Sequence, residues 1–243
     1  MVRQRVAVLL AGGGVKVALA AKAATSTMPI VLPIAADPVK FGLVTSLNRP
    51  GGNITGVTFI ATELVSKRVE LLRELLPQAA TIAFLSAPGF ASMPAQVSDA
   101  VAAAQALDRQ IVVVEARSES DFNAAFTTAI QRGAGGLIIG SASLFTSNLE
   151  KLSALAASHK ILTIYQYREY VVNGGLASYG ASIGEAYRLS SGYVGQILKG
   201  AKPGDLPFQQ SVKIDLVINV KTAKALGITI PATLLARADE VIE

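Results

Sequence analysis

Short apolar segments alternate with amphipathic segments along almost the whole chain. The apolar segments lack strict alternation with polar residues, which is typical of parallel strands covered on both faces. They occupy residues 5–11, 29–35, 54–59, 81–86, 110–115, 135–140, 161–165 and 213–219. Segments with helical periodicity occupy residues 15–25, 62–76, 93–108, 120–132, 146–159 and 183–199. This alternation predicts a doubly wound α/β fold with parallel sheets.

Three of the expected helices begin with residues that are favoured as N-caps. Thr62 opens the segment 62–76, and Ser118 precedes acidic residues in a first turn. Asn219, the last residue of the apolar segment 213–219, opens a further helix. The segment 62–76 also carries a clear apolar face, formed by Val65, Val69, Leu72 and Leu76. Because these four recur at spacings of three and four, we expect this helix to pack against the sheet.

Composition and charge exclude several classes of protein. Hydrophobic residues make up 51% of the 243 residues and charged residues only 16%, which excludes a disordered chain. No apolar run reaches the roughly 18 residues of a membrane span. The net charge of +5 comes from scattered Lys and Arg, so we expect no nucleic-acid partner. The absence of cysteine excludes disulfides, thiolate catalysis and cysteine-ligated metals.

The sequence gives little support for catalysis. Its one histidine, His159, lies at the end of an expected helix, on the side opposite the carboxyl ends of the strands. A helix-dipole role suits this position better than that of a general base. No G-x-S-x-G motif and no cluster of metal ligands is present. We therefore expect no enzymatic activity, no metal and no cofactor.

The distribution of the segments predicts two lobes. Residues 62–165 contain four strands and four helices, enough for an α/β lobe, whereas the first sixty residues supply three strands and one clear helix. A Gly/Pro-rich stretch, LKGAKPGDLP, precedes the tail. We expect residues 1–60 plus 207–243 to form a first, incomplete lobe and residues 61–206 to form the second lobe.

Candidate ligand-binding residues of the first lobe follow two expected strands, where open α/β sheets bind ligands. The loop AGGGVK contains Gly13 and Gly14, whose N–H groups at a helix start suit a carboxylate. It matches neither the Walker A pattern nor G-x-G-x-x-G, because position 17 is Val, and a plain tight turn is the alternative. Asp37 follows the next strand and precedes Pro38. It is either a cleft carboxylate that pairs with a ligand's amine or a helix N-cap, and it can be both. We expect the segment after it to form a helix or lid.

Candidates of the second lobe lie in four segments that are expected to follow strands and are rich in hydroxyl and aromatic side chains. The candidates are Ser86, Phe90, Ser141, Phe145, Tyr165 and Tyr179. The aromatic residues are expected to form apolar walls and the serines polar anchors of a pocket. For each aromatic residue, a place in the core is an equal alternative.

Several long segments resemble one family. The segments are AAKAATSTMPIVLPIAADPVKFGLVTSLNRPGGNITGVTF, KRVELLRELLP, GGLASYGASIGEAYR, GQILKGAKPGDLPFQQ and LVINVKTAKALGITIPATLLARADEVIE. Together they resemble the substrate-binding proteins of ABC transporters with the type 1 periplasmic-binding-protein fold, in the branch that includes tryptophan-binding members. The resemblance implies that the chain binds a small molecule, such as an amino acid or an aromatic carboxylate, between two hinged lobes. It also implies a membrane permease as partner and a periplasmic location.

The start of the chain departs from this family. Its members normally carry a signal peptide and two further βα units before the segment that matches RQRVAVLLAGGG. We interpret the first residues as a strand rather than a signal peptide, which implies a cytoplasmic location if this start is genuine. An incomplete first lobe exposes a sheet edge, so we expect a homodimer through that lobe. The alternative function is a Rossmann-type nucleotide-binding enzyme that uses the Gly12–Gly14 loop.

Overall fold

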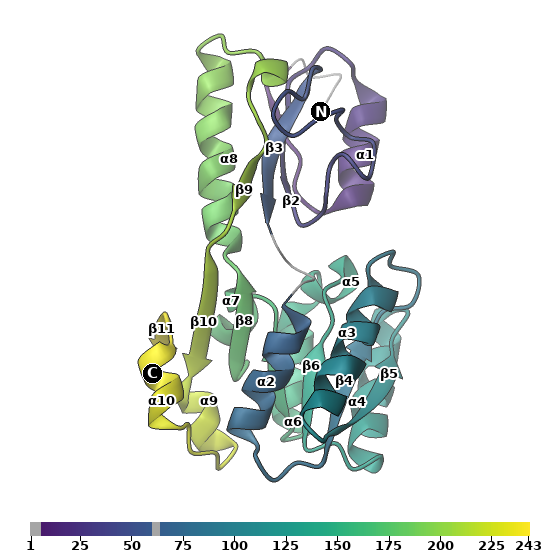
Figure 1. Ribbon diagram of the computed structural model, residues 1–243, viewed down its shortest axis with the longest axis vertical. Helices are drawn as coiled ribbons and strands as arrows, with labels where there is room; N and C mark the ends of the chain where they lie inside the picture. The colour runs from purple at the N-terminus through teal and green to yellow at the C-terminus, as the bar shows by residue number, and fades with distance from the viewer. Residues whose placement is uncertain (1–5, 60–63) are drawn as a thin grey trace. The chain divides into compact units, whose positions relative to one another are not determined.

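A computed structural model describes residues 6–59 and 64–243. The chain forms two compact units (Figure 1). The first consists of Met1–Ala61 and Ala181–Lys213, and the second consists of Thr62–Gly180 and Ile214–Glu243. Each unit is built on a sheet with parallel strand pairs and covered by helices, so the predicted α/β fold with two doubly wound sheets is confirmed.

This division differs from the predicted one in two places. Helix α8 (Ile183–Leu198) belongs to the first unit, because it packs against strands of the first sheet. The tail from residue 214 belongs to the second unit, because strand β10 (Ile214–Asn219) lies beside β8 (Ala177–Ala181) in the second sheet. The Gly/Pro-rich stretch is therefore not a boundary between units. It leads into β9 (Gln209–Ser211), which is a strand of the first sheet.

The first unit contains a four-stranded sheet in the order β1-β2-β3-β9, with every neighbouring pair parallel. Its other strands are β1 (Leu9–Leu10), β2 (Ile30–Ile34) and β3 (Ile54–Phe59). The first strand is shorter than the predicted segment 5–11, of which residue 5 lies outside the described residues. Helix α1 (Val15–Ala24) and helix α8 cover opposite faces of this sheet (Figure 1).

The side chains of β2 show why the strand is apolar throughout. Ile30, Leu32 and Ile34 belong to the cluster that includes residues of α1. Val31, between them, packs with Tyr193 of α8. Because successive side chains of a strand point to opposite faces, each face of β2 meets a different helix. The absence of polar alternation in this segment thus follows from burial on both sides.

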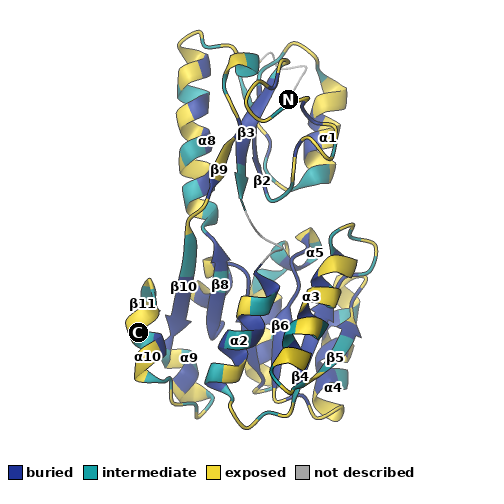
Figure 2. Ribbon diagram, in the orientation of Figure 1, coloured by how far each residue is buried: buried dark blue, intermediate teal, exposed yellow. Residues whose placement is uncertain are grey.

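The second unit contains a seven-stranded sheet in the order β11-β10-β8-β7-β6-β4-β5. Its remaining strands are β4 (Thr81–Ser86), β5 (Gln110–Glu115), β6 (Gly136–Ile139), β7 (Leu162–Tyr165) and β11 (Glu240–Ile242). Strands β4, β6 and β7 are buried along most of their length, as their dark blue colour in Figure 2 shows, while the outer faces of the helices are exposed. Strand β5, at the edge of the sheet, is mostly half-buried or exposed.

Helices cover both faces of the second sheet (Figure 1). They are α2 (Val65–Leu75), α3 (Met93–Ala106), α4 (Phe122–Gln131), α5 (Ser143–Thr146), α6 (Leu149–Ser158), α7 (Arg168–Val172), α9 (Val220–Ala225) and α10 (Ala232–Arg237). Among the described residues there are also two single 3₁₀ turns, Glu119–Asp121 before α4 and Pro203–Asp205 before β9.

The predicted helix caps have different outcomes. Ser118 forms a capping box with Asp121, and the side chain of Asn219 accepts a hydrogen bond from the N–H of Thr222 at 2.9 Å, so both caps are confirmed. Thr62 lies outside the described residues. Of the predicted apolar face, Val65, Val69 and Leu72 are buried, whereas Leu76 lies just after the end of α2 and is half-buried.

Some elements differ from their predictions or were not expected. The segment 178–182, expected as a loop, is mostly strand β8. The segment after Asp37 was expected to form a helix or lid; it contains turns and bends rather than a helix, and the lid stays a prediction. The short elements α7, β9, α10 and β11 have no clear apolar periodicity, and the sequence predicted none of them.

Candidate functional site

The candidate residues of the first unit lie at the carboxyl ends of two neighbouring strands. Strand β1 leads into Gly13 and Gly14, and strand β2 leads into Asp37. Because β1 and β2 pair in parallel, their carboxyl ends lie at the same edge of the sheet. Ligands of open α/β sheets bind at such an edge. The structure therefore places these three predicted residues on one side of the first unit.

The glycine loop has a backbone that favours glycine. Gly13 and Gly14 have φ angles of 116° and 90°, a region that side chains with a Cβ atom rarely adopt. Gly14 is the N-cap of α1 and, as a glycine, supplies no side-chain cap to the first turn of this helix. N–H groups at the start of a helix suit an anion, and binding of a carboxylate at this loop stays a prediction.

Asp37 caps its own turn. Its Oδ1 accepts hydrogen bonds from the N–H groups of Val39 at 2.8 Å and Lys40 at 3.2 Å. The capping alternative is therefore present in the structure, although the turn does not continue into a helix. Both of these hydrogen bonds use the same carboxylate oxygen, and the residue is exposed. A ligand's amine can thus reach Oδ2 without displacing the cap.

In the second unit, the structure brings together the ends of three neighbouring strands, β4, β6 and β7. Ser86 is the last residue of β4, Ser141 lies two residues beyond β6, and Tyr165 is the last residue of β7. The parallel pairing places all three at one edge of the sheet. Phe90 is half-buried in the loop after β4, and Tyr179 is half-buried within β8.

Two of the predicted aromatic residues lie in the core of the second unit. Phe145 is fully buried and its ring contacts that of Phe122, with 5.9 Å between the centroids. Tyr165 is also fully buried and stacks on Tyr170 at 4.6 Å. Burial raises the pKa of Tyr165 well above its ordinary value. For these two residues the structure matches the core alternative, and a direct ligand contact stays a prediction.

Gln96 was not predicted, but it holds one of the predicted residues in place. The side chain of Gln96 is completely buried in α3. Its Oε1 accepts from the N–H of Ser141 at 2.7 Å, and its Nε2 donates to the carbonyl oxygen of Ser141 at 3.0 Å. This pair of hydrogen bonds fixes the backbone after β6. A glutamine within an otherwise small, apolar helix face was the available sequence signal.

A buried arginine, also not predicted, lies among tyrosines near the ends of β7 and β8. Arg68 of α2 is completely buried, and its Nε donates to the carbonyl oxygen of Tyr179 at 2.8 Å. Desolvation lowers the pKa of Arg68 to about 10, while Tyr167 and Tyr170 partly oppose this shift. Burial also raises the pKa of Tyr167 to about 12. Arg68 thus links α2 to β8 inside the second unit.

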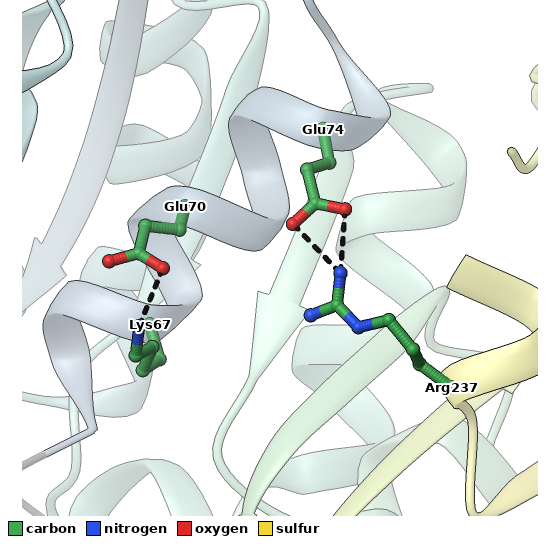
Figure 3. Close-up of polar contacts among 4 residues, drawn as sticks. All are labelled: Lys67, Glu70, Glu74 and Arg237. Atoms are coloured by element: carbon green, nitrogen blue, oxygen red, sulfur yellow. Dashed lines mark hydrogen bonds and ion pairs between the residues drawn. The ribbon is translucent and has the colours of Figure 1, made fainter. Parts of the chain in front are cut away.

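A polar cavity of about 270 Å³ lies on the surface of the second unit beside Tyr179. Its charged residues pair with one another (Figure 3). Lys67 contacts Glu70 at 2.8 Å, and Arg237 of α10 contacts Glu74 at 3.0 Å. Because these charges are already compensated, the cavity gives no reason to place a charged ligand there.

A larger cavity, of about 520 Å³, lies away from the candidate residues. Its lining includes Ile161 and Leu176, which directly precede β7 and β8, and Ala225 and Leu226 at the end of α9. It is therefore at the amino ends of β7 and β8, the opposite edge from Ser86, Ser141 and Tyr165. Two polar side chains around the cavity, Asn219 and Thr222, donate hydrogen bonds to backbone carbonyl oxygens of the protein itself.

The described residues contain no arrangement that indicates catalysis or metal binding. The Nε2 of His159 forms a hydrogen bond with Oδ1 of Asn123 at 3.0 Å, and its ring stacks on Phe126. No group of three or more potential His, Cys, Asp or Glu metal ligands occurs in this part of the chain. Nor does any of its helices combine the length and hydrophobicity needed to cross a membrane.

A comparison with protein-family models identifies the family of this chain. Residues 1–242 match the family model described as ABC transporter substrate binding protein. A curated relative, the tyrosine-binding protein of Clostridioides difficile strain R20291, is 28% identical over 86% of this chain. The chain spans 60% of that relative's length.

Two solved structures are also similar. A conserved domain protein from Vibrio cholerae is 30% identical, with a TM-score of 0.82 over 99% of this chain and 80% of the other. An ABC domain from Streptococcus pneumoniae, solved in complex with L-Trp, is 27% identical, with a TM-score of 0.81 over 99% of this chain and 82% of the other.

Proposed function

The chain belongs to the family of ABC transporter substrate-binding proteins, and we propose that it is the solute-binding component of an importer. Its ligand in this proposal is an aromatic amino acid or a related aromatic carboxylate. The observation that carries the ligand class is the likeness, over 99% of this chain, to a structure solved with L-Trp. The relative described as a tyrosine-binding protein supports the same class.

We assign the parts of an amino acid to different residues. The N–H groups after Gly13 and Gly14 bind the carboxylate, because the N-cap residue Gly14 has no side chain that could cap the helix instead. Asp37 binds the amine through Oδ2, since its described backbone hydrogen bonds use Oδ1. The side chain of the ligand contacts the half-buried Phe90 and Tyr179. Ser86 and Ser141 supply polar contacts at the strand ends.

The proposal includes a membrane permease as partner, a location outside the cytoplasmic membrane and no enzymatic activity. The family match supports all three, because substrate-binding proteins deliver a ligand rather than convert it. The surroundings of His159 also argue against catalysis, because its ring packs on Phe126 and bonds to an amide. The nucleotide-binding alternative for the Gly12–Gly14 loop gains no support from the comparisons.

A thermal-shift screen tests the ligand class. A ligand that binds only the native state raises the melting temperature. We expect L-tryptophan or L-tyrosine to raise it in a saturable way, and NAD and ATP to leave it unchanged. A cooperatively unfolding protein that shows no shift with any amino acid or aromatic acid would contradict the proposal.

Replacing Asp37 by Asn tests its role in binding the amine. Asparagine is an N-cap as effective as aspartate, so the turn keeps its cap while the charge is lost. We expect Asp37→Asn to lower the affinity for L-tryptophan about tenfold or more, because a charge-assisted hydrogen bond is lost. The affinity for indole-3-propionate, which lacks the amine, should stay unchanged. Equal affinities of the variant and the wild-type protein for L-tryptophan would leave Asp37 with the capping role alone.

The predicted homodimer remains a proposal. Strand β1 forms an edge of the first sheet, and Val6, Leu10, Val17 and Leu19, in or next to β1 and α1, are exposed. Exposed apolar side chains beside an open edge favour pairing with a second copy. Light scattering at micromolar concentration tests this, and a monomer would refute it.

A further inference from the structure

Tyr187 lies at the border between the buried and exposed faces of α8. The buried residues of this helix are Ala186, Ser190, Tyr193 and Ile197. Tyr187, next to the first of them, is 39% exposed. On the exposed side, Glu185 and Arg188 form an ion pair at 2.6 Å. The large aromatic side chain of Tyr187 is thus only partly buried in the first unit.

The phenol of Tyr187 lies directly against Gly12. A Cβ atom added at Gly12 would be 2.1 Å from Oη and 3.1 Å from Cζ of Tyr187. Any residue other than glycine at position 12 would therefore push the ring away. Gly12 connects the end of β1 to the Gly13–Gly14 turn. The Tyr187 hydroxyl is consequently held beside the loop that we propose binds a carboxylate.

The hydroxyl of Tyr187 differs from that of its neighbour on the same helix. The Oη of Tyr193 donates a hydrogen bond to the carbonyl oxygen of Pro207, so its polar atom is satisfied within the first unit. Within residues 6–59 and 64–243, Tyr187 Oη forms no hydrogen bond. It is therefore available to donate to a ligand.

We propose that Tyr187 is a specificity-determining residue, whose hydroxyl donates a hydrogen bond to the carboxylate of the ligand beside Gly12. The inference rests on the proposed function and assigns a residue that neither the sequence nor the comparisons indicate. Glycine at position 12 is required because it lets the phenol approach the loop. A hydrogen bond to a charged group is stronger than one between neutral groups, so its loss has a measurable effect.

Titration calorimetry on the full chain tests this with two probes, L-tryptophan and tryptamine, which lacks the carboxylate. Tyr187→Phe keeps the ring and removes only the hydroxyl. We expect Tyr187→Phe to lower the affinity for L-tryptophan about tenfold or more and to leave the affinity for tryptamine unchanged. Gly12→Ala, which displaces the ring, is expected to act in the same selective way. Leu198→Ala, at an exposed position of the same helix, is the matched control and should change neither affinity.

Each outcome separates this inference from the proposed function. If the wild-type protein binds L-tryptophan and Tyr187→Phe binds it equally well, the role of Tyr187 is refuted and the function stands. An equal loss of both probes refutes the contact with the carboxylate. If the folded wild-type protein binds neither L-tryptophan nor L-tyrosine, the proposed function and the role of Tyr187 fall together. Circular dichroism shows that each variant is folded before it is titrated.

Discussion

Arg68 donates a hydrogen bond from Nε to the backbone carbonyl oxygen of Tyr179 at 2.8 Å, in a part of the second unit where its side chain is completely buried. Arg68 lies near the start of α2, and Tyr179 lies just before the chain leaves the second unit after Gly180. The bond therefore joins the beginning and the end of the longer segment of this unit, 111 residues apart.

Replacing Arg68 by Lys tests this link. Lysine has no Nε donor in the guanidinium position, so the buried carbonyl of Tyr179 loses its partner. We expect the free energy of unfolding in urea to fall by about 1–3 kcal/mol, the usual cost of an unsatisfied buried group. Arg73→Lys, at an exposed position of the same helix, should change it by less than about 0.5 kcal/mol. Identical unfolding curves for both variants would contradict a structural role for Arg68.

Gly180 permits a close approach between two strand ends. A Cβ atom at Gly180 would lie 1.8 Å from the carbonyl oxygen of Gln166. We expect Gly180→Ala to lower the free energy of unfolding by at least about 1–3 kcal/mol, because the backbone must move. Gly192→Ala, where an added Cβ meets nothing within 4 Å in α8, should instead stabilise by roughly 0.5–1 kcal/mol. Urea unfolding measures these two changes in the free energy of unfolding, which should have opposite signs. An unchanged free energy of unfolding in Gly180→Ala would count against the steric argument.

Gln96 is expected to be important for the stability of the backbone after β6. In Gln96→Ala, the N–H and carbonyl of Ser141 lose their side-chain partners in a buried place. The expected loss is about 1–3 kcal/mol of unfolding free energy. Gln105→Ala, an exposed glutamine of the same helix, is the control and should be nearly neutral. Faster hydrogen exchange at the Ser141 amide in Gln96→Ala would locate the effect.

Acid conditions should remove the contribution of the Ser118–Asp121 capping box. The N–H of Arg117, the N–H of Ser118 and the Ser118 hydroxyl, in that order, lower the pKa of Asp121 from its ordinary value of 3.8. A group whose pKa is lowered on folding stabilises the native state above its unfolded pKa, and loses this effect as the pH falls through the folded value. We therefore expect Asp121→Asn to have a lower melting temperature than the wild-type protein at pH 7, and this difference to disappear as the pH falls below about 4. A difference that stays constant with pH would contradict the assignment.

The fold was largely predictable because a strand that is buried on both faces is a continuous apolar segment, which can be recognised in the sequence without knowing its partners. Every position of β2 is buried, so the strand reads as one apolar segment. Strand β8 was missed because Ser178 and Gly180 interrupt its apolar pattern. The glycine is required by the carbonyl of Gln166, which a reading of β8 alone cannot reveal. The tail was assigned to the wrong unit because strand partners are set by tertiary packing rather than by distance along the chain.

The candidate site was predictable only in part. The positions of Gly13, Asp37 and Ser86 at or just after the carboxyl ends of strands were predictable, because parallel strands align these ends; their contact with a ligand stays a prediction. The same rule selects Phe145 equally well, although Phe122 on another helix covers its ring. Gln96 has its partner 45 residues away, so no local pattern reveals that interaction.

The interleaving of the two units has a consequence for protein synthesis. The first unit needs residues from Ala181 onwards, and the second needs residues from Ile214 onwards, so neither is complete when its first segment leaves the ribosome. At about 5–20 residues per second, the 119 residues from Thr62 to Gly180 delay the return to the first unit by roughly 6–24 s. During that interval the face of β2 that later meets Tyr193 has no helix to cover it. A nascent chain of this type is therefore exposed to chaperones for longer than its length alone suggests.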